Sequence, residues 1–432
     1  MTVIEEEQAT EHIHGICLKT GPPRRIGVEL EWLVRDARDP ALPVPAARIA
    51  TAVAAFGADP GPRRLPSSAR PGVLPSGGLL TTEPGGQLEL SSLPADSLTE
   101  CVRSVAADAG VLRAAAADAG LELTGVGLDP LRPPRRVLNL PRYAAMEAFF
   151  DRGGPWGRQM MCATASVQVC LDAGDESDGP AGYRSRWRLL HAIGPVLVAA
   201  FANSPLRRGR PTGWRSSRQQ VWAHMDPGRT RPPSLNGRSN GDPRAAWARY
   251  ALDAQVMCVR SSGSDDWSAP PGLTLREWVR GGVLEGGERL RAPTDEDIAY
   301  HLSTLFPPVR PRGHFELRMI DAQPGDGWVV PAAVTSALLS DQAAGEAAMA
   351  AVEPLWAARP GADHADPWLT AARHGPAHAW LARASRACFE AARSALSRQG
   401  TPGEIAAAVD AFVDDYVTKD RCPADDLLEE VK

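Results

Sequence analysis

The sequence predicts an α+β protein in which helices pack an antiparallel sheet with one polar, metal-binding face, followed by a helical C-terminal region. Two observations lead to this prediction. Four short segments between residues 26 and 319 alternate apolar with acidic or amide side chains, which is the pattern of strands with one buried face. From residue 331 onward the chain is Ala-rich, and its patterning is almost wholly helical.

The first polar segment spans residues 26–34 and carries two carboxylates. Alternate residues from Ile26 to Val34 are apolar, so Glu29 and Glu31 stand together on the opposite face of the strand. Neighbouring carboxylates repel each other unless a cation lies between them, such as a divalent metal, a guanidinium or a substrate amine. Taken alone, this pair fits equally well a solvated face of an antiparallel sheet.

The same alternation recurs in three further segments. Their polar faces consist of Gln87, Glu89 and Ser91 in 83–91; Ser166, Gln168, Cys170 and Asp172 in 165–172; and His314, Glu316 and Arg318 in 314–319. Repetition over four segments favours a metal-binding face over four solvated ones. Carboxylate and amide oxygens with little His select Mg²⁺ or Mn²⁺ over Zn²⁺.

Helical patterning fills the intervals between these strands. Ser97 and Glu100 form a capping box that predicts a helix start, and Gly120 is placed to end that helix. The segment 206–244 is rich in Arg, Pro, Gly and Ser, and we expect a long binding loop there. Further helices are expected in 46–56, 141–150, 183–201 and 244–259, and a further strand in 121–126.

Composition excludes several classes of function. The formal net charge of -5 over 432 residues gives no electrostatic case for a nucleic-acid partner. No apolar run reaches the ~18 residues of a membrane span, and the seven scattered cysteines suit a reducing compartment, so we expect a cytoplasmic protein without a membrane partner. Lysine occurs only at Lys19, Lys419 and Lys432, so arginine is expected to bind any phosphate or carboxylate.

The polar segments resemble those of glutamate–cysteine ligases of the plant and proteobacterial type. These enzymes belong to the carboxylate–amine ligase superfamily, and the resemblance implies a fold related to glutamine synthetase. The matching segments follow the family's order from about residue 24 to 330, and they are 26–31, 83–91, 167–172, 201–205, 213–222 and 305–310 leading to 315–318. The composition resembles an actinobacterial member, which implies a role in ergothioneine biosynthesis.

The resemblance also implies roles for individual residues. The metal ligands would be Glu29, Glu31, Glu83, Glu89, Gln168 and Glu316. Arg318 would contact the transferring phosphate and, with Glu316, take part in catalysis; Arg218 would bind the α-carboxylate of glutamate, with Gln168 also near the substrate. We place Arg229, in the same loop region, at the ATP site.

The implied reaction is ATP-dependent joining of the glutamate γ-carboxylate to the cysteine amine through a γ-glutamyl phosphate. Glutamate, cysteine and ATP are then the small-molecule partners, and Mg²⁺ (or Mn²⁺) is the metal. Two alternatives remain open: a ligase for a different acceptor or donor, and a non-catalytic protein that binds metal or an amino acid. Because the polar strands are spread along the chain, we expect one interleaved domain over 1–432, with the catalytic sheet and loops in 24–330 and helices in 331–432.

Overall fold

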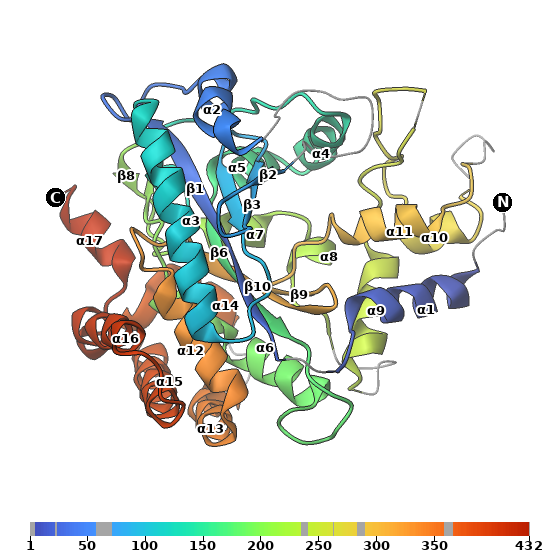
Figure 1. Cartoon of the computed structure of the whole chain (residues 1–432). Coiled ribbons are helices and arrows are strands. Elements are labelled where there is room, and N and C mark those ends of the chain that lie inside the picture. Colours follow the sequence, from blue (N-terminus) through green and yellow to red (C-terminus); the bar gives the residue numbers. More distant parts are fainter. Residues whose placement is uncertain are drawn as a thin grey trace.

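A mixed α/β architecture surrounds one central antiparallel sheet (Figure 1). The computed structural model describes residues 5–21, 24–57, 71–234, 241–261, 263–282, 290–357 and 366–431. The strand order is β2 (Gly72–Val73), β3 (Leu79–Thr82), β4 (Leu88–Ser91), β1 (Ile26–Asp36), β6 (Ser166–Asp172), β10 (His314–Asp321) and β9 (Val309–Pro311). β5 (Leu121–Thr124) pairs with the second half of β1, and β7 (Leu206–Arg207) forms a separate small hairpin with β8 (Arg210–Pro211).

The four polar segments become neighbouring strands of this sheet, in the order β4, β1, β6 and β10. Antiparallel pairing places Glu31 opposite Glu89 and Glu29 opposite Gln168. The predicted antiparallel sheet with helices is therefore confirmed. The segment 83–91 is not one strand, however. Glu83 begins the tight turn between β3 and β4, where its N–H donates to the carbonyl of residue 87 at 2.8 Å.

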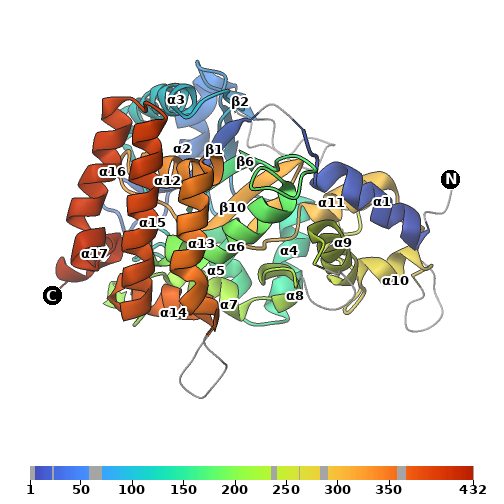
Figure 2. The same cartoon turned by 90° about the horizontal axis from the view of Figure 1, so that it is seen from below.

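Helices from two distant parts of the chain cover the apolar face of the sheet. α3 (Leu98–Asp118), α6 (Tyr183–Ala200) and α12 (Val329–Ser340) pack on the strands, because alternate side chains such as Val28, Leu30 and Leu317 are buried there. Figure 2 shows α13 (Gln342–Ala357), α15 (Ala379–Arg398) and α16 (Gly403–Asp415) as a further layer beyond them. The described residues after 331 are thus mainly helical, as predicted.

Short helices lie over the polar face and form a second, smaller core. They are α4 (Pro141–Asp151), α5 (Trp156–Ala163), α7 (Ser217–His224), α8 (Pro227–Thr230) and α11 (Asp295–Leu302). The predicted long loop 206–244 is therefore wrong for much of its length. Ser216 accepts from the N–H of Gln219 at 3.1 Å and Asp226 accepts from that of Gly228 at 2.9 Å, and these caps begin α7 and α8 within a Gly/Arg-rich stretch.

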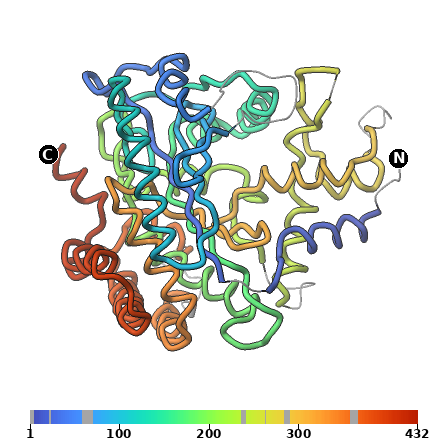
Figure 3. The backbone as a smooth tube through the Cα atoms, in the orientation of Figure 1, coloured from blue at the N-terminus to red at the C-terminus, as the bar shows by residue number. Residues whose placement is uncertain are grey.

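The N-terminal helix closes one side of the molecule. α1 (Glu6–Cys17) packs beside α9 (Pro243–Asp253), α10 (Leu275–Val279) and α11, as the blue and yellow segments of Figure 3 show. The remaining α-helices with given bounds are α2 (Ala46–Val53), α14 (Pro367–His374) and α17 (Pro423–Glu429). Among the described residues, no helix combines the length and apolar character needed to cross a bilayer. The single interleaved domain and the relation to glutamine synthetase stay predictions.

Candidate active site

A cavity of about 610 Å³ opens over the polar face of the sheet. The sheet and its turns contribute carboxylates and arginines, and the covering helices contribute further arginines, aromatic rings and methionines. The lining includes Glu31, Glu83, Gln87, Arg142, Tyr143, Met146, Met160, Met161, Arg218, Trp222, Arg260, Glu296, Tyr300, Ser303, Phe306, Arg312 and Arg318. Two of the predicted carboxylates and both Arg218 and Arg318 thus line one space. A site with this charge pattern suits substrates that carry carboxylate or phosphate groups.

The carboxylates on the β1–β4 side of the cavity are crowded and poorly compensated. Burial and repulsion from Glu316 and Glu89 raise the pKa of Glu29 to about 8. Burial and repulsion from neighbouring carboxylates, Glu31 among them, raise the pKa of Glu83 to about 7 and that of Glu89 to about 8. A bound cation would relieve this repulsion and favour the ionised forms. The donor chemistry therefore fits a hard divalent cation.

Hydrogen bonds hold one of these carboxylates in place. Glu31 accepts from the backbone N–H of Ser166 at 2.8 Å and from the side-chain amide of Gln168 at 3.0 Å. Both donors come from β6, so the strand pairing itself orients the Glu31 side chain. Glu89 is held by the hydroxyl of Thr81 at 3.0 Å on the other flank. The row of acidic side chains is therefore a fixed feature of the sheet.

Glu316 differs from the other carboxylates because arginines surround it. It is fully buried, and Arg310 donates to it through two nitrogens at 2.7 and 3.1 Å. Arg318 contacts both Glu316 and Gln168. Burial alone would raise the pKa of Glu316, but these guanidiniums and Arg312 lower it, so the group is ionised. Glu316 thus lies inside an arginine cluster rather than facing an open ligand position.

The geometry does not place a metal site. Among the described residues, no group of three or more His, Cys, Asp and Glu side chains is close enough together to hold an ion. Arg318 lies against two of the predicted ligands, Glu316 and Gln168. The metal-binding role of this face stays a proposal that rests on donor chemistry.

A β-bulge in β10 positions the arginine predicted to bind glutamate. Leu317 pairs with Val169 but Ile320 pairs with Val167, so one extra residue lies between these two pairs. The carbonyl of Arg318 within this bulge accepts from Arg218 Nη2 at 2.8 Å. Arg218 is 1 % exposed, and its guanidinium lies 4.4 Å from the ring centre of Trp222. A buried arginine is thereby fixed at the wall of the cavity.

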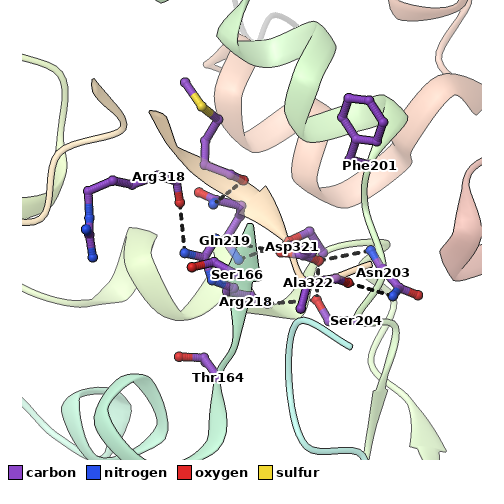
Figure 4. A network of polar contacts seen from close by, with 12 residues as sticks. Thr164, Ser166, Phe201, Asn203, Ser204, Arg218, Gln219, Arg318, Asp321 and Ala322 are labelled. Carbon is purple, nitrogen blue, oxygen red and sulfur yellow. Dashed lines mark hydrogen bonds and ion pairs between the residues drawn. The ribbon is translucent and has the colours of Figure 1, made fainter. Parts of the chain in front are cut away.

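Asp321 organises the polar network behind Arg218, which Figure 4 shows at close range. Its carboxylate accepts from the backbone N–H of Asn203 at 2.9 Å and from the hydroxyls of Ser204 at 2.7 Å and Ser216 at 3.0 Å. Arg218 Nη1 lies 3.8 Å away. Burial raises the pKa of Asp321, and these donors oppose that effect. The Asn203 to Ser204 segment, quoted above for its resemblance, therefore anchors the arginine.

The structure places Arg229, predicted at the ATP site, among the packed short helices. This side chain is fully buried and donates to the Thr304 carbonyl at 2.7 Å and to its hydroxyl at 2.9 Å. Its guanidinium also lies 4.8 Å from the ring centre of Phe149 and 3.4 Å from Asp226. Arg229 is not among the residues that line this cavity, and its contacts tie α8 to its neighbours; its place at the ATP site stays a prediction.

Sequence reasoning missed several residues of the site. Arg142 lies in α4, Tyr300 lies in α11, and Arg260 follows α9 in an irregular stretch. Asp321 lay just beyond the predicted strand. No local pattern marks the first three as neighbours, because α4, α11 and the segment after α9 meet only in the folded chain.

A second cavity, of about 360 Å³, lies at the other end of the same polar face. Glu29, Cys170 and His314 line it from the sheet, and Lys19 and Arg25 line it from the surrounding segments. Glu29 and Glu31 stand two residues apart on β1, so the row of carboxylates runs between the two cavities. Lys19 is the exception to the expectation that arginine alone would supply positive charge near the site.

Comparison with known proteins places the chain among the carbon–nitrogen ligases. The chain belongs to glutamate–cysteine ligase family 2 (GCS2), whose model matches residues 25–431. It is 39% identical to the glutamate–cysteine ligase EgtA of Mycobacterium tuberculosis, over 99% of this chain and 91% of that protein. It is 32% identical to the chloroplastic glutamate–cysteine ligase of Brassica juncea, over 57% of this chain and 46% of that one. The resemblance drawn from the polar segments is confirmed.

A solved structure supports the fold. The glutamate–cysteine ligase of Francisella tularensis, solved in complex with AMP, superposes with a TM-score of 0.51 at 10% identity. The superposition covers 95% of this chain and 85% of that one. This likeness concerns the arrangement of sheet and helices alone.

Proposed function

We propose that this protein joins the γ-carboxylate of glutamate to the amine of cysteine, using ATP, to form γ-glutamylcysteine. The observation that carries the proposal is the fixed position of Arg218 in a cavity that also contains the carboxylate row. The full-length family match supports it. We propose further, from the resemblance to actinobacterial members, that the product enters ergothioneine biosynthesis. A cytoplasmic location stays a prediction.

The chain's own residues account for how glutamate would be oriented. A substrate with two carboxylates must present only the γ-carboxylate for reaction. Arg218 Nε and Nη1 make no hydrogen bond within the described part of the chain, so the guanidinium keeps unused donors for the α-carboxylate. The γ-carboxylate would then extend toward Glu31 and Arg318 on the sheet. Orientation of this kind lowers the barrier by fixing the reacting groups in place.

A carboxylate oxygen is a poor leaving group, so the reaction needs activation. Transfer of the γ-phosphoryl group of ATP to the substrate γ-carboxylate releases ADP and gives an acyl phosphate. The cysteine amine then attacks the carbonyl carbon, the amide C–N bond forms, and inorganic phosphate leaves. Phosphoryl transfer depends mainly on positioning and on neutralising charge. Arg318, held against Glu316, supplies a fixed positive charge beside the sheet.

A divalent cation fits the acidic row. Glu29, Glu31, Glu83, Glu89 and Gln168 would hold it, since the crowded carboxylates lack a compensating charge of their own. Bound Mg²⁺ would supply neutralisation of the ATP phosphate oxygens. Glu316 belongs to this set only if its arginine partners release it.

We infer that the two cavities receive different substrates. Because Arg218 lines the larger cavity, we assign that cavity to the amino-acid substrates. The smaller cavity carries Lys19 and Arg25 beside Glu29, and a cationic rim next to the acidic row suits the phosphates of ATP. Both substrates would then meet along the row between Glu29 and Glu31.

The deciding experiment is ADP release from purified protein given glutamate and a panel of amines, with and without Mg²⁺. We expect release to require glutamate, cysteine and Mg²⁺ together, and mass spectrometry to show γ-glutamylcysteine. Efficient ligation of another amine without dipeptide from cysteine would assign a different acceptor. Binding of ATP and glutamate with no turnover on any amine would assign a non-catalytic protein.

A further inference from the structure

Among the arginines that line the larger cavity, one forms no ion pair with a carboxylate of the described residues. Five arginines line it. Four of them lie within 4.0 Å of a carboxylate: Arg218 with Asp321, Arg260 with Glu296 and Asp297, and Arg312 and Arg318 with Glu316. Arg142 forms no ion pair within the described part of the chain. Its charge acts on Glu83 in the same cavity without a direct ion pair, so an anionic ligand can still pair with it.

Arg142 is held rigidly by neutral groups. It donates through Nη1 to the hydroxyl of Ser303 at 3.0 Å and through Nη2 to the Ser303 carbonyl at 3.3 Å. Its guanidinium carbon lies 5.0 Å from the ring centre of Tyr300, and that of Arg260 lies 5.1 Å from the same ring. These contacts fix the position of the Arg142 charge without neutralising it, which is the arrangement of a preorganised anion site.

We propose that Arg142 binds the carboxylate of the acceptor amino acid and so makes the enzyme selective for α-amino acids over simple amines; this inference rests on the proposed function. Arg142 shares its cavity with Arg218, so an acceptor held there has its amine beside the bound donor. The planar guanidinium matches a carboxylate through paired hydrogen bonds.

The surroundings of Arg142 favour an amino acid over a nucleotide phosphate. Met146, Met160 and Met161 line the same cavity, and their soft, apolar surfaces suit the thiol side chain of cysteine. Lys19, the lysine of the site, lines the other cavity, which is the one assigned to ATP. A phosphate ligand at Arg142 would show as a change in the KM for ATP.

The test compares cysteine with cysteamine, which has the same amine and thiol but no carboxylate. The wild-type enzyme should prefer cysteine in kcat/KM. In Arg142→Gln this preference should fall by at least about 30-fold, as expected for loss of one partner of a charged hydrogen-bonded pair. The fall should come from the cysteine arm, with kcat/KM for cysteamine changing by less than about threefold. Arg142→Lys keeps the charge but loses the planar set of donors, so its preference for cysteine should lie between those of the wild type and Arg142→Gln.

Arg152→Gln is the matched control. Arg152 follows α4 directly and lies 4.7 Å from the ring centre of Phe149, but it is exposed and does not line the cavity. The Arg152→Gln enzyme should prefer cysteine over cysteamine as strongly as the wild-type enzyme does.

The possible outcomes separate the hypotheses. An unchanged preference in Arg142→Gln would overturn the inference, as would a raised KM for ATP with the preference intact. If Arg142→Gln does not fold, Arg142→Lys decides: a preference equal to that of the wild type overturns the inference and a reduced one supports it. A wild-type enzyme that ligates both amines equally well refutes the acceptor-carboxylate site alone. One that ligates neither refutes the proposed function as well.

Discussion

Replacing Arg218 by lysine should raise the KM for glutamate strongly and leave the KM for ATP nearly unchanged. Arg218 Nη2 is occupied by the Arg318 carbonyl at 2.8 Å, whereas Nε and Nη1 have no hydrogen-bond partner among the described residues. These unused donors of a planar cation can hydrogen-bond a carboxylate. Lysine offers a single compact ammonium group, which cannot reproduce the spacing and direction of the guanidinium donors.

The size of the effect follows from these contacts. Losing one partner of a buried, charged hydrogen-bonded pair costs ~2–5 kcal/mol. Expressed as affinity, this is a rise of roughly 30- to 1,000-fold in the KM for glutamate. The variant also loses the bond to the Arg318 carbonyl and the stacking on Trp222, so its thermal midpoint should fall. Stability and KM must therefore be measured separately.

The assay is steady-state ADP release with glutamate varied at saturating ATP and cysteine, and then with ATP varied. Arg229→Lys is the matched control because Arg229 is equally buried but lies outside the cavity lining. It should lower the thermal midpoint and leave the KM for glutamate unchanged. A KM for glutamate within twofold of wild type in Arg218→Lys, roughly 0.4 kcal/mol, would refute the assignment.

Three further predictions concern charged groups in and beside the sheet. Glu29→Gln should nearly abolish turnover without loss of stability at pH 8. Glu316→Gln should instead cost ~3–5 kcal/mol of unfolding free energy, because it leaves Arg310 and Arg318 without their carboxylate partner. Urea unfolding measures both stabilities, and equal values for the two variants would contradict this contrast. Lys19→Gln should raise the KM for ATP and spare that for glutamate, and the reverse result would exchange the two cavities. Because the folded-state pKa values of Glu29 and Glu89 are raised to about 8, the folded metal-free protein binds more protons than the unfolded chain between about pH 4.5 and 8. Its stability should therefore fall across that window, and thermal melts should show Mg²⁺ stabilising the protein more at pH 8.5 than at pH 6; a shift independent of pH would argue against a metal on this face.

The sequence was informative where the functional side chains follow the two-residue alternation of a β-strand. Alternation along 26–34 assigns Glu29 and Glu31 to one face whatever the neighbouring strands are, because side chains on a strand alternate strictly. Apolar residues opposite them had to be buried, which predicts helices on the other face. The family resemblance then assigned these segments to one active site, which the alternation alone does not do.

The rest depended on features without a local signal. The bulge after Leu317 changes the alternation of β10, so Asp321 lies in the network behind Arg218 on the polar side of the sheet. Regular alternation from Glu316 would send Asp321 to the apolar face. In 206–244, capping by Ser216 and Asp226 outweighs a composition that is typical of loops. The position of Arg142 depends on α4 meeting α11, which is a tertiary contact.

The two cavities at opposite ends of one acidic row have a consequence for inhibitor design. A compound that fills only one cavity competes with only one class of substrate. If a single molecule carried an amino-acid group for the Arg218 end and an anionic group for the Lys19 end, binding at one end would raise the effective concentration at the other. Its linker would have to pass Glu29 and Glu31 and should therefore carry positive charge in place of a metal ion. Such a compound would bind more tightly in metal-depleted buffer, which is the opposite of the dependence expected for ATP.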